Sequence, residues 1–335
     1  MTSDLATANP ALGVVIIGRN EGERLRRCLD SITGTGTTVI YVDSASTDGS
    51  VELARSNGAD VVELDMTIPF TAARARNAGF ARLRQRVPTV RFVQFVDGDC
   101  EVIDKWLGAA TRYLAEHPEV ACVCGPVKER FPDLSVYHRL HTHHPIESNH
   151  EIKACGGIFM IRADVFQAVG GFREDLATGE EMQLCRRIRE RGGQIWGLDC
   201  PMAWHDAAIV KFGQWWRRTR RTGYTYAQAT ALYGIGELEI IRPILRSWLW
   251  VVVLPMVVLA GLLMAGPHAL WLLLAFPLQT LRMASSLDGA FGVRLTSACF
   301  LMLGKVPELI GQLQFWFNSS RERHVLARSF DKSSS

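Results

Sequence analysis

Short apolar runs alternate with amphipathic stretches through the first third of the chain. Val39 to Val42, Val61 to Leu64 and Phe92 to Val96 are rich in β-branched and aromatic residues, which is the pattern of short buried strands. Between strands, apolar residues recur at helical spacing, as at positions 25, 28, 29 and 32. This alternation predicts an α/β fold with a mostly parallel central sheet covered on both faces.

Acidic residues follow the predicted strand ends. Glu21 comes after the first strand, Asp43 after the second, and Asp97-Gly98-Asp99 directly after Phe92 to Val96. Ligands of parallel sheets bind outside the carboxyl ends of the strands, so these side chains are expected to converge on one crevice. Two carboxylates separated by one residue suit Mg²⁺ or Mn²⁺, which neutralises a diphosphate leaving group. The alternative for Asp-Gly-Asp is a solvated turn.

A long uncharged stretch dominates the C-terminal part. Ser247 to Leu281 contains no Asp, Glu, Lys or Arg, and Gly266-Pro267 interrupts it near the middle. About 20 residues cross a bilayer, so the stretch predicts a helical membrane hairpin with spans at about 247–265 and 268–286. Arginines on both sides place its two ends in the cytoplasm. The alternative is a buried hairpin in a soluble protein.

The remaining segments are less apolar. Residues 295–317 are interrupted by Lys305, Pro307 and Glu308, which favours an amphipathic helix in the membrane interface over a third, broken span. The tail, 319–335, is basic and then Ser-rich. Residues 1–10 are polar, lack the apolar core of a signal peptide and are expected to be disordered. Domain boundaries are therefore predicted near residues 11, 235 and 318.

Charge and cysteine content exclude some classes of protein. A net charge of +3 over 335 residues gives no support to a nucleic-acid partner. The arginines between Lys211 and Arg246 lie just before the uncharged stretch and suit an anionic membrane surface. The eight cysteines lack CxxC pairs and are expected to be reduced and mostly buried.

Five motifs in series resemble the family 2 inverting glycosyltransferases over about residues 11 to 235. They are Gly13 to Glu21, Val39 to Ser50, Arg74 to Gly79, Asp97-Gly98-Asp99, and Gly170-Gly171-Phe172 leading to Gly179 to Leu184. The resemblance implies a sugar-nucleotide-binding domain of the type called GT-A. Two departures are Ile17-Gly18-Arg19-Asn20 in place of Pro-Thr-Tyr-Asn, and Ser44 in place of a second acid.

The resemblance also implies roles for individual residues. Those matching the nucleotide-sugar contacts are Ile17, Glu21, Asp43, Arg76 and Asp97. Asp99 and Asp97 are implied as ligands of a divalent cation, Mg²⁺ or Mn²⁺, with His205 as a candidate third ligand. Glu181 matches the general base that deprotonates the acceptor hydroxyl, and its neighbour Glu180 remains a rival.

Together these features predict a membrane-anchored bacterial glycosyltransferase of polysaccharide or glycolipid biosynthesis. Its donor is a nucleotide-diphosphate sugar, with UDP favoured, and its acceptor is a lipid-linked or other membrane-proximal glycan. The catalytic domain is expected on the cytoplasmic side of the cell inner membrane. Two alternatives are a nucleotidyltransferase, which needs a Gly-rich triphosphate loop that Gly18 to Gly22 does not supply, and a non-catalytic membrane scaffold.

Overall fold

The computed structural model describes residues 12–140, 149–176, 178–234 and 238–331 of the chain. The predicted disordered N-terminus and the last four residues of the tail lie outside these ranges. The chain divides into two compact units. The first comprises residues 1–131 and 142–207, and the second comprises residues 132–141 and 208–335.

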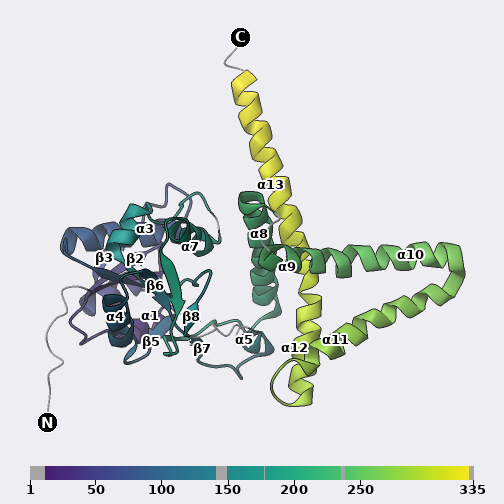
Figure 1. Ribbon diagram of the computed structural model, residues 1–335, viewed down its shortest axis with the longest axis horizontal. Coiled ribbons are helices and arrows are strands. Elements are labelled where there is room, and N and C mark those ends of the chain that lie inside the picture. The colour runs from purple at the N-terminus through teal and green to yellow at the C-terminus, as the bar shows by residue number, and fades with distance from the viewer. Residues whose placement is uncertain (1–11, 141–148, 177, 235–237, 332–335) are drawn as a thin grey trace. The chain divides into compact units, whose positions relative to one another are not determined.

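An eight-stranded sheet forms the centre of the first unit (Figure 1). Its strand order is β3-β2-β1-β4-β9-β6-β10-β8. β1 pairs in parallel with β2 and β4, β2 with β3, and β6 with β10, whereas β9 is antiparallel to both of its neighbours and β8 to β10. The predicted α/β class with a mostly parallel sheet is confirmed. The strands are β1 (Leu12–Gly18), β2 (Thr38–Asp43), β3 (Asp60–Glu63), β4 (Phe92–Asp97), β6 (Val120–Cys124), β8 (His150–Glu151), β9 (Phe159–Arg162) and β10 (Gln194–Gly197).

The central strands are buried on both faces, which explains their continuous apolar runs. Val14 to Ile16 of β1 and Val93, Phe95 and Val96 of β4 have no exposed surface. Helices that connect the strands supply the covering layers. α3 packs tightly on the sheet at Gly79, because a Cβ added there would overlap the Val15 side chain and lie 2.9 Å from that of Val42. The helices of this unit are α1 (Glu23–Asp30), α2 (Ser50–Ser56), α3 (Ala72–Arg86), α4 (Trp106–Glu116), α6 (Ala163–Ala168) and α7 (Glu180–Glu190).

A second, three-stranded sheet follows the end of β4. It consists of β5 (Cys100–Val102), β11 (Ala203–His205) and β7 (Val127–Glu129), in the order β5-β11-β7. In this sheet His205 is the register partner of Cys100 on one side and of Glu129 on the other. This pairing places His205 beside Cys100 and Glu129, which lie more than 70 positions away from it in the sequence.

The described part of the second unit is helical. Its long helices α8 and α13 pack closely, because Gly223 and Gly311 carry no side chain at their contact. A Cβ added at Gly311 would overlap the backbone oxygen of Arg220, and one added at Gly223 would overlap that of Glu308. Its elements are α5 (Val136–Arg139), α8 (Phe212–Tyr233), α9 (Leu238–Trp248), the π-helix η1 (Leu249–Val253), α10 (Leu254–Ala265), the 3-10 helix η2 (Gly266–Leu274), α11 (Ala275–Ser285), α12 (Phe291–Leu303) and α13 (Lys305–Asp331).

The uncharged stretch forms two arms that meet at a bend between α10 and η2 (Figure 1). Gly266 at the bend has φ 71°, and the rings of Trp250 and Phe276 on the two arms lie 5.4 Å apart. The continuous helical stretch Ile241–Ser285 is long and apolar enough to cross a membrane, and only 6% of its most apolar window is buried. The side chains of this window are therefore mostly exposed in the described structure.

Some boundaries differ from those expected. The division between units falls after Ala207, ahead of the expected position 235, because α8 packs along α13. Residues 295–317 are divided between α12 and α13 at Gly304, with Pro307 in the first turn of α13, where no backbone donor is lost. α13 continues to Asp331 and so includes most of the expected tail.

Candidate active site

The carboxyl ends of β1, β2 and β4 bring the predicted donor-side residues together. Ile17 is the register partner of Asp97, and Gly18 is the register partner of Asp43. The Gly98 amide donates to the Ile17 backbone oxygen at 2.8 Å, which fixes the turn that carries both aspartates of Asp97-Gly98-Asp99. The site therefore lies at the edge of the sheet where parallel α/β folds bind ligands.

Asp43 is almost completely buried, with 2% of its surface exposed. One carboxylate oxygen accepts a hydrogen bond from the Tyr41 hydroxyl at 3.0 Å, and the other accepts one from the Ser46 amide at 2.8 Å. These bonds stabilise the loop after β2. The carboxylate has lone pairs left for a ligand, but it offers little surface.

Arg76 of α3 joins three carboxylates from two distant parts of the chain. Its side chain is 3% exposed and lies 2.9 Å from Asp97, 2.9 Å from Glu180 and 3.0 Å from Glu181, each measured between the closest N and O atoms. A buried guanidinium requires such partners, because an unpaired charge in the interior is costly. Its donors thus tie the end of β4 to the first turn of α7.

Glu180 and Glu181 differ in exposure although they are adjacent. The Glu181 side chain is 19% exposed and the Glu180 side chain 8%. Burial raises the pKa of Glu181 above the ordinary glutamate value; Arg76 opposes this shift, and the charge of Glu180 adds to it. Of the two acids, Glu181 is therefore better placed to meet a substrate and is more basic than an ordinary glutamate.

Gly157 leaves space beside this cluster. A Cβ added at Gly157 would lie 2.7 Å from an Arg76 nitrogen, 2.8 Å from an Asp97 oxygen and 3.4 Å from a Glu181 oxygen. Any larger residue would displace these charged side chains.

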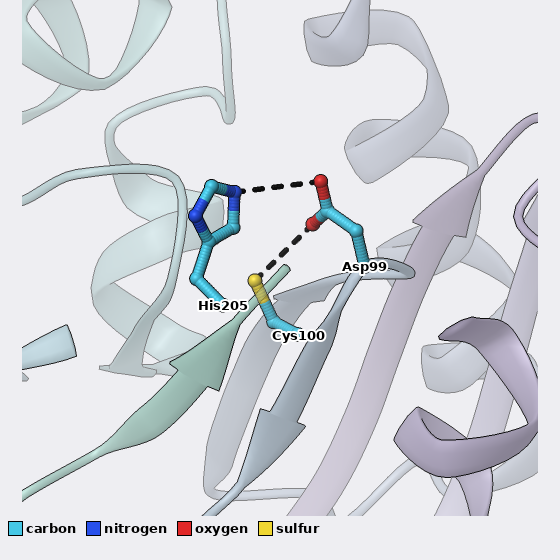
Figure 2. A group of neighbouring side chains, drawn as sticks. All are labelled: Asp99, Cys100 and His205. Atoms are coloured by element: carbon cyan, nitrogen blue, oxygen red, sulfur yellow. Dashed lines mark hydrogen bonds and ion pairs between the residues drawn. The ribbon is translucent and has the colours of Figure 1, made fainter. Parts of the chain in front are cut away.

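Asp99, Cys100 and His205 form a second cluster, at the start of the three-stranded sheet (Figure 2). His205 Nε2 lies 3.4 Å from an Asp99 oxygen, and the Cys100 thiol donates to the other Asp99 oxygen at 3.2 Å. On its far side, His205 Nδ1 lies 3.0 Å from the Glu129 carboxylate. Glu129 thereby orients the ring so that Nε2 faces Asp99.

The donor set fits a divalent cation. A carboxylate and an imidazole suit Mn²⁺ or Mg²⁺, and metal-binding histidines commonly donate their second ring nitrogen to a carboxylate, as His205 does to Glu129. Burial raises the pKa of the Cys100 thiol, so it stays neutral and is a poor ligand for such an ion. Asp99 and His205 are therefore the side chains of this cluster that could hold the cation.

Asp99 and His205 stabilise each other's charged forms. Burial alone would raise the pKa of Asp99, but the hydrogen bond and charge of His205 outweigh it and hold that pKa below its ordinary value. Burial alone would lower the pKa of His205, but its bonds to Asp99 and Glu129 raise it to about 9. An imidazolium therefore occupies this place at neutral pH, and cation binding would release its proton.

Glu21 is affected by the charges of both clusters, through Asp99 of one and Asp97 of the other. Burial raises its pKa to about 7; Arg24, 2.6 Å away, opposes this shift, and the negative charges of Asp99 and then Asp97 add to it. The side chain of Glu21 also lies close to Gly98, because a Cβ added at Gly98 would be 3.1 Å from Glu21 Cγ. Glu21 is thus packed against the turn that carries both aspartates.

Asp97 and Asp99, both implied as cation ligands, have different partners in this structure. Asp97 was expected to share a cation with Asp99 and His205, but its carboxylate is 2.9 Å from Arg76, while Asp99 faces His205. Glu129 was not expected at all. It is a single acid in an ordinary strand segment, and only the pairing of β7 with β11 brings it to His205.

Comparisons with known proteins show similarity to glycosyltransferases. Residues 13–178 match the family described as Glycosyl transferase family 2. The chain is 25% identical over 285 residues to Glycosyltransferase AglE of Haloferax volcanii, covering 81% of this chain and 86% of that protein. It is 26% identical over 204 residues to the Pre-mycofactocin glycosyltransferase of Mycobacterium tuberculosis, covering 58% of this chain but only 42% of that relative.

A solved structure shares the fold. It is a mannosyltransferase from Pyrobaculum calidifontis in complex with GDP-Man and Mn²⁺, with a TM-score of 0.54 and 17% identity, covering 93% of this chain and 90% of that one. At this identity the likeness concerns the fold. That protein binds its nucleotide sugar together with a divalent cation.

Proposed function

Because its α/β unit belongs to glycosyltransferase family 2, we propose that this chain transfers a sugar from a nucleoside-diphosphate sugar to an acceptor hydroxyl with inversion at the anomeric carbon. The juxtaposition of Arg76 with Asp97 and with Glu180 and Glu181 carries this proposal. One guanidinium connects a donor-side acid at the sheet edge to the acids proposed to act on the acceptor. Donor and base therefore belong to a single site.

In the proposed reaction Glu181 accepts the proton of the acceptor hydroxyl as that oxygen attacks the anomeric carbon. The bond from that carbon to the diphosphate oxygen breaks, and the electron pair leaves with the nucleoside diphosphate. Arg76 holds Glu181 in place and keeps its carboxylate oriented. A divalent cation held by Asp99 and His205 would neutralise the leaving diphosphate. Glu129 fixes the ring of His205 for that task.

The donor side of the site is proposed to consist of Ile17, Glu21, Asp43 and Asp97. Asp43 would accept hydrogen bonds from the base or the ribose through the carboxylate lone pairs that Tyr41 and Ser46 do not use. We favour UDP as the nucleotide. The GDP-Man bound by the structurally similar mannosyltransferase makes GDP the first competitor to test.

The proposed acceptor is lipid-linked or lies close to the membrane. The support is the exposed apolar stretch Ile241–Ser285, which would hold the enzyme at a bilayer. Arginines precede and follow the two arms, so both ends are proposed to lie in the cytoplasm, with the catalytic unit on the cytoplasmic face of the inner membrane. This arrangement suits the assembly of a polysaccharide or a glycolipid.

Release of nucleoside diphosphate tests the proposed activity. Detergent-purified full-length protein is incubated with UDP-, GDP- and dTDP-sugars, with Mg²⁺, Mn²⁺ or EDTA, and with membrane-lipid extract as a source of acceptor. We expect release from one donor, dependent on the cation, and a product whose anomeric configuration is opposite to that of the donor by NMR. Retention of configuration would refute the mechanism. No turnover or hydrolysis of any donor would favour a non-catalytic scaffold.

A further inference from the structure

A cavity of about 250 Å³ lies in the first unit at the opposite end of β4 from the candidate active site. Arg91 directly precedes β4, and Phe92, the first residue of that strand, is the register partner of Arg162. Arg84 comes from the last turn of α3. The cavity is lined by Arg84, Val90, Arg91, Arg162, Asp164 and Gln167.

The three arginines of this cavity differ in their partners from other arginines of the first unit. Among the residues that the structure describes, none of them forms an ion pair, although most arginines of this unit do. Arg84 donates to the Pro88 backbone oxygen at 2.7 Å. Arg162 donates to the backbone oxygens of Val120 at 2.8 Å and His117 at 3.0 Å, and also to that of Leu114.

Positive charge therefore accumulates in the cavity. Asp164 is the one acid of the lining, and its carboxylate accepts from the Val165 amide at 2.8 Å. Burial lowers the pKa of Arg162; Asp164 opposes this shift, and the charge of Arg91 adds to it. The Arg91 guanidinium makes no hydrogen bond with any described residue, so its donors remain available.

Two of the guanidinium groups contact the same aromatic ring. The Cζ atoms of Arg91 and Arg162 lie 5.3 and 5.7 Å from the centroid of the Phe92 ring. Cation–π attraction offsets part of the repulsion between the two charges. A bound anion would remove the rest, and guanidinium groups match the oxygens of a phosphate group well.

We propose that this cavity is an anion site for a phosphate monoester group and that it is separate from the donor site. Phe92 and Asp97 are five positions apart along β4, which is about 17 Å at 3.3 Å per residue. An anion held by Arg91 and Arg162 therefore cannot be the diphosphate of a donor placed beside Asp97. The cavity is small, which suits a single phosphate group, either of a soluble metabolite or of a lipid headgroup.

Titration of inorganic phosphate into full-length, detergent-purified protein tests this site. Isothermal titration calorimetry is performed in EDTA at constant ionic strength set with chloride, so that no cation-dependent binding contributes. We expect saturable binding that Arg91→Gln weakens about tenfold or more, the loss typical of a hydrogen bond to a charged group. Arg91 makes no hydrogen bond with the described residues, so this change removes charge without removing a structural bond.

Two further variants separate a site from a general effect of charge. Arg84→Gln should also weaken binding, whereas Arg112→Gln, on exposed α4 surface outside the cavity, should not. Short-chain phosphatidic acid below its micelle concentration is compared with inorganic phosphate to distinguish a lipid headgroup from a free metabolite. Tighter, Arg91-dependent binding of the lipid would assign a headgroup, and equal binding would assign a soluble phosphate. No saturable binding of either compound, or equal binding by wild type and Arg91→Gln, would overturn the proposal.

Discussion

The proposed base can be tested by replacing Glu181 with Gln. In the structure Glu181 accepts a hydrogen bond from Arg76 at 3.0 Å, and a Gln side-chain oxygen can still accept it. Asp97 and Glu180, each 2.9 Å from Arg76, remain to balance the guanidinium charge. Exchanging a charge-assisted hydrogen bond for a neutral one costs about 1 kcal/mol of folding stability, so the variant should fold.

The effect on the reaction should be much larger than the effect on stability. Removing a general base costs about 10² to 10⁴ in rate, or about 2.7 to 5.4 kcal/mol of transition-state stabilisation. We therefore expect kcat of Glu181→Gln to fall into this range while nucleotide affinity changes little. Glu180→Gln is the matched control, because it also removes one carboxylate charge beside the same Arg76 nitrogen. Its kcat should stay within about tenfold of wild type.

The pH profile gives a second reading of the same residue. A base works deprotonated, so wild-type kcat should be lost as the pH falls through the pKa of Glu181, which burial raises above the ordinary glutamate value. Glu181→Gln should lack this acid limb. Nucleoside-diphosphate release measures both quantities. A larger loss in Glu180→Gln would move the base to Glu180, and near-wild-type kcat in both variants would remove both acids from the mechanism.

Three further predictions concern the cation, the cleft and the membrane. Asp99→Asn should lose most turnover and Mn²⁺ binding while keeping its thermal unfolding midpoint within a few degrees, and activity that persists in EDTA would argue against a cation-dependent reaction. Gly157→Ala should lower kcat by about tenfold or more because its Cβ meets Arg76 and Asp97; unchanged kinetics would mean that this backbone moves away freely. Reporter fusions should place Gly266 on the far side of the membrane and a site after Arg328 in the cytoplasm, and a cytoplasmic signal from both would indicate a hairpin that does not cross.

The local pattern of the sequence was sufficient for several features. Runs of apolar residues identified β2 and β4, because strands with buried faces need continuous apolar side chains. A β-branched run also identified β3, which lies half-buried at the edge of the sheet. The same reasoning identified the apolar arms and their bend at Gly266. Motif order identified the family, since each motif marks the end of a strand or the start of a helix that the fold requires.

Contacts between distant segments could not be predicted in this way. The sequence implied Arg76 only as a nucleotide-sugar contact, whereas the structure also buries it among acids from β4 and α7. The expected grouping of Asp97 with Asp99 rested on their spacing. The direction of each side chain depends on its partner. Asp97 meets Arg76, 21 residues away in the chain, and Asp99 meets His205, 106 residues away.

The sequence by itself therefore determined the fold class, the family and the set of charged residues at the strand ends, because hydrophobic periodicity and turn residues act over short distances along the chain. Only the tertiary structure decided how those charges are paired. The pairing of β7 and β5 with β11 brings Glu129 and Asp99 to opposite nitrogens of His205, and strand order is set by packing of the whole sheet. The cavity of Arg84, Arg91 and Arg162 arises for the same reason, since α3, β4 and β9 meet there only in the folded chain.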